Sequence, residues 1–127
     1  MNPAAPILHF GRAIRYAWSG VRILLRTQRS FRIHAALGLL TIAAGAALRL
    51  PVAAWCGLTL AIGVVLSAEA LNTAVEFLAD IVSPAYHPAI KRVKDVAAAA
   101  VFFAATAAAV LALFLLGPPI WARLTGR

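Results

Sequence analysis

The sequence predicts an all-α integral membrane protein, in which an N-terminal amphipathic surface helix precedes three transmembrane helices. Hydrophobic residues make up 63% of the 127-residue chain and charged residues only 13%, which is too apolar for a soluble domain of this length. Uncharged runs extend over residues 51–68 and 96–122, and a shorter one over 35–48 is bounded by His34 and Arg49. A bilayer core needs about 17 to 25 helical residues, so each run can cross once, the shortest with its polar ends at the interfaces.

We expect residues 1–127 to form a single membrane domain, with transmembrane helices at 31–48, 52–82 and 92–116. A short turn at 49–51 connects the first two. At 1.5 Å per residue, the helix over 52–82 is about 45 Å long and exceeds the hydrocarbon core by about 15 Å. Because its outer end is held by the short turn, the surplus is expected on the opposite side. The Gly-Pro-Pro segment at 117–119 is expected to end the last helix.

Residues 1–29 are predicted to form the surface helix. At the helical period its apolar and cationic side chains occupy different arcs. The apolar arc holds Phe10, Ile14, Ala17, Trp18, Val21, Leu24 and Leu25, and the cationic arc holds Arg12, Arg15, Arg22 and Arg26. Such a helix is expected to lie in the lipid headgroup layer. A solvated flank that only orients the protein is the alternative.

The net charge of +8 is unevenly distributed along the chain. Six arginines lie before or at the start of the first predicted span and three cations lie between the second and third, whereas only three cations lie on the other side. By the positive-inside rule, the N-terminus faces the cytoplasm and the C-terminus faces outward, in a bacterial cytoplasmic membrane. This placement argues against nucleic acid as a partner. Cys56 is the single cysteine, which excludes a disulfide framework and a thiolate metal site within the chain.

All four carboxylates lie within residues 69–95, and three of them share one helix face with Asn72. Taking Glu69 as the origin, Asn72 falls at about −60°, Glu76 at about −20° and Asp80 at about +20° on an ideal helix. Aligned acids repel one another, and near a membrane each also carries a desolvation cost. A function or a set of cationic partners is therefore expected.

Three alternatives follow for this acidic face. An acid–base cluster joining two helices would use Arg92, Lys94 and Asp95 at the start of the next helix. An ion or proton pathway fits poorly, because the first part of the helix over 52–82 has only Thr59 and Ser67 as polar residues. A catalytic role suits the placement better.

Phosphoryl transfer to a membrane alcohol is the chemistry that this arrangement favours. Glu69 at the membrane boundary can activate a lipid hydroxyl, Glu76, about 10 Å further along the axis, can hold a divalent cation, and Lys94 can stabilise the transferred group. The sequence contains no Walker loop, dinucleotide fingerprint or protein-kinase motif set. Any nucleotide site must therefore be built from side chains.

A motif over 69–76, Glu-x-x-Asn-Thr-Ala-x-Glu, is followed by Asp80, Tyr86-His87-Pro88 and Lys94-Asp95. With these residues the sequence resembles the prokaryotic diacylglycerol kinase family, which includes undecaprenol kinases. The likeness covers nearly the whole chain. It implies a small ATP- and Mg²⁺-dependent lipid kinase of three transmembrane helices and a surface helix, assembled as a homotrimer with composite sites between protomers.

The resemblance also implies roles for individual residues. It makes Glu69 the catalytic base and Glu76 a magnesium ligand. The nucleotide site would comprise Tyr16, Asn72, Glu76, Asp80, Tyr86, His87, Lys94 and Asp95. The lipid substrate would lie beside Trp18, Arg22, Phe31, Arg32 and Glu69.

Two positions depart from the family pattern. Gln28 stands where the family usually has a second metal-binding glutamate, and His9 stands where many members carry arginine. A glutamine carbonyl can ligate magnesium but adds no negative charge. We therefore keep Gln28 in the predicted metal site and expect the cation to be held more weakly.

The sequence thus predicts an ATP-dependent lipid kinase with diacylglycerol or undecaprenol as acceptor, and segments 32–34 and 86–88 look more like the undecaprenol branch. The competing prediction is a noncatalytic membrane protein whose acidic face serves helix assembly. His34 can be a site residue or a ring placed beside the interface, and His87 a site or a turn residue. Trp18 and Trp55 are equally well explained as interfacial anchors.

Overall fold

The computed structural model describes the backbone of residues 5–126 and the side chains of residues 10–126. It consists of four α-helices, α1 (Ala5–Thr27), α2 (Arg29–Ala47), α3 (Val52–Val82) and α4 (Pro88–Leu124), and residues 5–126 contain no β-strand. Three of them, α2, α3 and α4, are long and apolar enough to cross a membrane. The predicted fold class is confirmed. Residues 1–4 of the predicted surface helix and the side chain of His9 lie outside the described residues.

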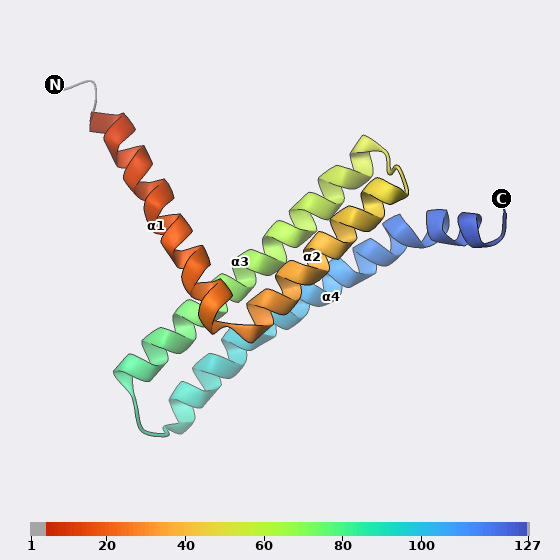
Figure 1. Ribbon diagram of the computed structural model, residues 1–127. Helices are drawn as coiled ribbons and strands as arrows, with labels where there is room; N and C mark the ends of the chain where they lie inside the picture. The colour runs from red at the N-terminus through yellow and green to blue at the C-terminus, as the bar shows by residue number, and fades with distance from the viewer. Residues whose placement is uncertain (1–4, 127) are drawn as a thin grey trace.

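Helices α2, α3 and α4 form an antiparallel bundle, and α1 leaves this bundle at an angle (Figure 1). Gln28 alone separates α1 from α2, and its extended backbone (φ −105°, ψ 112°) allows the chain to change direction. The apolar side chains Phe10, Ile14 and Trp18 of α1 are each more than half exposed. This open face suits contact with lipid, and the headgroup location of α1 stays a prediction.

Small residues allow α2 to approach α3 closely. A Cβ atom added at Gly38 would lie 3.1 Å from Cγ2 of Ile62, and one added at Gly45 would lie 3.2 Å from the ring of Trp55. Close approach of this kind is typical of membrane helices, where packing rather than water exclusion drives association. These contacts fix the position of α2 on α3 and bring the first turn of α2 beside Glu69.

Helix α2 begins two residues before its predicted start and ends one residue before its predicted end, whereas α3 occupies the predicted range. Between them, Arg49 has a φ of 56°, in the left-handed region. A non-glycine residue in this conformation costs roughly 1–2 kcal/mol. The turn between α2 and α3 is therefore tight and locally strained.

Helix α4 begins earlier than predicted. Its first residue is Pro88 rather than Arg92, and Nδ1 of His87 accepts a hydrogen bond from the backbone N–H of Ala89 at 3.2 Å. Proline is favoured in the first turn of a helix, and a side-chain acceptor just before it satisfies a free N–H group. The sequence contained this signal, which the prediction did not use.

Helix α4 also ends later than predicted. It continues through Pro118 and Pro119 to Leu124, so the expectation that these prolines end the helix is wrong. Proline removes backbone hydrogen bonds and bends a helix, but membrane helices tolerate it, and α4 changes direction near its C-terminal end (Figure 1). The extension brings Arg123 to the carbonyl oxygen of Ala47, to which it donates a hydrogen bond of 2.6 Å. A free carbonyl at the end of α2 is thereby satisfied.

Candidate functional site

Glu69 is a buried acid in the interior of the bundle. Its side chain is only 3% exposed. Oε2 accepts a hydrogen bond from Oγ of Ser30 at 2.8 Å, and Oε1 lies 2.7 Å from Nδ1 of His34. Ser30 and His34 are one turn apart on α2, so both face α3. Burial of a carboxylate costs free energy when it has no hydrogen bonds, and these two contacts offset that cost for Glu69.

The polar face of α3 continues beyond Glu69. Asn72 donates a hydrogen bond from Nδ2 to Oε1 of Glu76 at 2.9 Å. The other amide atom of Asn72, Oδ1, is buried and has no hydrogen-bond partner in the described part of the chain. Thr73, on the same face, is 3% exposed. This turn of α3 therefore carries a carboxylate and an amide whose nitrogen, rather than its carbonyl oxygen, faces that carboxylate.

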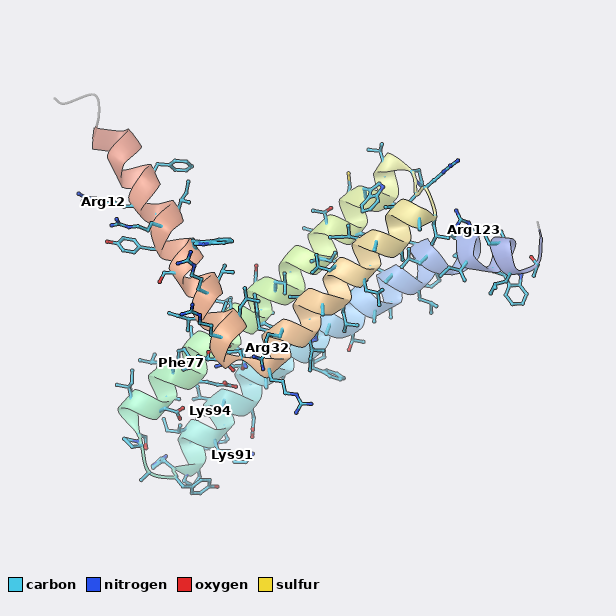
Figure 2. All side chains as sticks on the ribbon, viewed as in Figure 1. Arg12, Arg32, Phe77, Lys91, Lys94 and Arg123 are labelled. Carbon is cyan, nitrogen blue, oxygen red and sulfur yellow. The ribbon has the colours of Figure 1, made fainter. Side chains whose placement is uncertain are left out.

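Ion pairs lie at the ends of α3 and α4 next to their loop, and one of them joins the two helices. Lys94 of α4 pairs with Asp80 of α3, and Lys91 pairs with Asp95 within α4 at 2.6 Å. Figure 2 shows Lys91 and Lys94 at this end of α4, with Arg123 at the opposite end of the molecule. The structure thus brings Asp80 and Lys94 together, as the acid–base alternative required.

An apolar cavity of about 400 Å³ lies between α2, α3 and α4. Its wall on α4 is made of small side chains: Ala105, Ala108, Ala109 and Ala112. On α2 it begins at His34, and on α3 it is lined by residues that precede Glu69, such as Ile62 and Val65. The cavity therefore lies on the apolar side of Glu69, whereas Asn72 and Glu76 lie on the other side.

Glu76 supplies carboxylate oxygens for a magnesium ion, and Asn72 can add its carbonyl oxygen once its amide turns that atom toward Glu76. Magnesium prefers oxygen ligands and in nucleotide sites commonly uses one or two protein side chains together with phosphate oxygens. Within residues 10–126 no three His, Cys, Asp or Glu side chains are grouped so as to hold a metal by themselves. Gln28 lies in the connection between α1 and α2, and its role as a metal ligand stays a prediction. A cation here would depend on bound phosphates.

The family model described as prokaryotic diacylglycerol kinase matches residues 15–116 of the chain. The chain belongs to this family. The predicted family is therefore confirmed. A Synechocystis diacylglycerol kinase is 43% identical over 109 residues, which cover 85% of this chain and 62% of that protein. The undecaprenol kinase of Bacillus subtilis is 32% identical over 111 residues, which cover 87% of this chain and 90% of that protein. The chain thus spans less than two thirds of the Synechocystis relative.

The residues that membership of the prokaryotic diacylglycerol kinase family suggests for the nucleotide fall into two groups. Most of them lie on the adjoining ends of α3 and α4 or in the loop between them: Asn72, Glu76, Asp80, Tyr86, His87, Lys94 and Asp95. Tyr16 lies instead on α1, is 68% exposed and carries the guanidinium carbon of Arg15 5.9 Å from its ring centre. A single protomer of this family member therefore distributes the predicted nucleotide residues over two separate parts of the structure.

The residues suggested for the lipid substrate differ in exposure. Trp18, Arg22 and Arg32 are exposed, whereas Phe31 is buried at 6%. Phe31 thus belongs to the packed interior at the start of α2. Its contact with lipid stays a prediction, as do the lipid contacts of Trp18, Arg22 and Arg32.

Sequence reasoning did not assign Ser30, Thr73 and Lys91, and it left the role of His34 open. Thr73 lies inside the recognised motif and falls at about +40° on the face of Glu69, so helical geometry could have placed it. Ser30 and His34 have the i, i+4 spacing of neighbours on one helix face. The sequence could not show which acid they contact, because that acid is on another helix.

Proposed function

We propose that this member of the prokaryotic diacylglycerol kinase family is an ATP- and magnesium-dependent lipid kinase. It transfers the γ-phosphoryl group of ATP to the hydroxyl group of a membrane lipid alcohol, diacylglycerol or undecaprenol. The observation that supports this most is the position of Glu69, buried between an apolar cavity and a row of polar side chains. One relative is a diacylglycerol kinase and the other an undecaprenol kinase, which supports the same class of acceptor.

The cavity suits the hydrocarbon part of the acceptor. Its alanine-rich wall on α4 leaves open volume where larger side chains would fill the bundle. The cavity ends at His34, which contacts Glu69. A lipid hydrocarbon chain bound in the cavity would therefore bring the polar end of that lipid to the level of Glu69. Both alcohols have such a polar end on a long apolar chain.

The proposed reaction uses four side chains. Glu69 accepts the proton of the acceptor hydroxyl, whose oxygen bonds to the γ-phosphorus while the bond from this phosphorus to the β–γ bridging oxygen breaks and ADP leaves. Lys94 stabilises negative charge on the phosphates and exchanges its Asp80 partner for them. A magnesium ion held by Glu76 and Asn72 would neutralise phosphate charge.

A noncatalytic assembly role is the competing proposal, and the Asp80–Lys94 ion pair between α3 and α4 is the observation in its favour. Both side chains are partly exposed, however, and exposed pairs contribute only about 0–1 kcal/mol to stability. The pair therefore explains little of the association of the helices. It also leaves unexplained why Glu69 is buried without a lysine or arginine partner among residues 10–126.

Purified protein in lipid nanodiscs, supplied with ATP, magnesium and each alcohol in turn, tests the proposal. We expect phosphorylated lipid from at least one alcohol, and a loss of about 10²- to 10⁴-fold in Glu69→Gln, the range of general-base catalysis. The glutamine amide can still pair with Ser30 and His34, so the unfolding midpoint of the variant should stay close to that of the wild-type protein. Absence of product from both alcohols in the wild-type protein rejects the kinase, and full activity of Glu69→Gln rejects the assigned base.

Assembly as a homotrimer in the cytoplasmic membrane, with the N-terminus inside and the C-terminus outside, is part of the proposal. The separation of Tyr16 from the α3–α4 end supports sites completed by a neighbouring protomer. Co-assembling Glu69→Gln protein with Tyr16→Ala protein tests this, because the two changes lie in the two separate parts of the protomer, on α3 and on α1. A shared site should recover part of the activity, whereas no recovery in co-assembled protein would favour sites within one protomer.

A further inference from the structure

Glu69 has two hydrogen-bond partners that the proposed chemistry does not use. Ser30 and His34, both on the first turns of α2, contact different oxygens of the carboxylate at 2.8 and 2.7 Å. His34 is the one cationic or potentially cationic side chain within ion-pair distance of Glu69 among residues 10–126. Both hydrogen-bond partners of the Glu69 carboxylate thus come from α2. This helix carries none of the residues proposed to act on the phosphates.

The direction of these hydrogen bonds follows from the chemistry of the acid. To act as the proposed proton acceptor Glu69 must be ionised, and an ionised carboxylate can only accept hydrogen bonds, so in that state Nδ1 of His34 must carry the proton that faces Glu69. Two donors on different oxygens fix the plane of the carboxylate as well as its position. Each oxygen retains a lone pair, so the acid can still accept a proton from a substrate hydroxyl.

The location of His34 fits a supporting rather than a reacting group. Its ring lines the apolar cavity, and its side chain is 24% exposed while that of Glu69 is 3% exposed. The ring therefore stands between Glu69 and the apolar space. An aliphatic side chain at this position would leave one carboxylate oxygen without a partner.

We propose that His34 is a positioning residue for Glu69, which holds the carboxylate in the orientation that accepts the acceptor proton, with Ser30 as the second support. This inference rests on the proposed kinase function. The role requires a hydrogen-bond donor at the position of Nδ1. It does not require an imidazole that gains or loses protons.

A pair of amide substitutions tests this requirement. The amide nitrogen of asparagine is separated from Cβ by the same number of bonds as Nδ1 of histidine, whereas that of glutamine is one bond further away. His34→Asn can thus keep the donor in place, and His34→Gln is the matched variant that displaces it. His34→Leu removes the donor. The assay measures kcat and KM for MgATP with the better of the two alcohols.

We expect His34→Asn to retain kcat within about threefold, and His34→Gln and His34→Leu to lose about 10- to 100-fold, the effect of losing a hydrogen bond to a charged group. KM for MgATP should change less than about twofold in all three, because uniform binding of the nucleotide is unaffected. Ser30→Ala should show a smaller loss in the same direction.

Three outcomes would overturn the proposal. Full activity of His34→Leu would show that the contact is dispensable, and an equal loss in His34→Asn and His34→Leu would show that the imidazole itself is needed. A raised KM for MgATP at unchanged kcat would place His34 with the nucleotide. If His34→Leu does not fold, as judged by its unfolding midpoint, the comparison of kcat between His34→Asn and His34→Gln tests the proposal instead. An inactive wild-type protein would reject the proposed function instead, so the two failures are distinguishable.

Discussion

Replacement of Gly38 by valine should move α2 away from α3 and weaken the contact between His34 and Glu69. A Cβ at Gly38 would lie 3.1 Å from Cγ2 of Ile62, whereas carbon atoms in favourable contact are about 3.5–4.0 Å apart. The added Cβ would therefore lie about 0.4–0.9 Å closer to Ile62 than a favourable contact allows. Since His34 is one turn away, a shift of this size would stretch its 2.7 Å contact with Glu69 to about 3.1–3.6 Å, at or beyond the limit of a good hydrogen bond.

The expected cost of this overpacking is about 1–3 kcal/mol, or roughly 4–12 °C in the unfolding midpoint. We expect kcat to fall about tenfold through the weakened hydrogen bond to a charged group. Gly63→Val is the matched control, because a Cβ there meets nothing within 4 Å in the protomer. Unfolding in detergent and kinase assays on both variants make the comparison. Equal midpoints and equal kcat in the two variants would refute the reasoning.

Three further predictions address the polar end of the site and the end of the bundle where α4 meets α2. Glu76→Gln should raise the magnesium concentration for half-maximal activity about tenfold, with activity recovering at saturating magnesium, because one charged oxygen ligand is lost; an equal loss at all magnesium concentrations would contradict a metal role. Gln28→Glu should lower the same requirement by adding a charged ligand, and an unchanged or raised requirement would count against Gln28 as a ligand. Arg123→Met removes the 2.6 Å hydrogen bond to Ala47 and should cost about 0.5–1.5 kcal/mol of stability; a fall in kcat at an unchanged midpoint would argue against a purely structural role.

The fold class followed from the sequence because apolar run length directly reports membrane spanning. Helix α3 has the predicted bounds, whereas the predicted end of α4 at Gly117-Pro118-Pro119 was wrong. Local rules treat proline as a terminator, but here the helix continues and Arg123 reaches α2. That contact joins residues far apart in sequence, so no local pattern could reveal it.

The acidic face of α3 could be predicted from helical period alone, since Glu69, Asn72, Glu76 and Asp80 all lie on one helix. Contacts between side chains of different helices could not be predicted in this way. The sequence offered several cations as partners for the acids, and the structure pairs Lys94 with Asp80 but gives Glu69 a serine and a histidine instead.

The sequence by itself determined the number of spans, the amphipathic first helix and the row of acids, because each depends on periodicity or composition within one segment. The tertiary structure alone decided that Glu69 is buried, that Ser30 and His34 hold it and that an apolar cavity begins beside it. These features depend on how closely α2 approaches α3 at Gly38 and Gly45. The packing of side chains from different helices sets that approach, and no single segment encodes it.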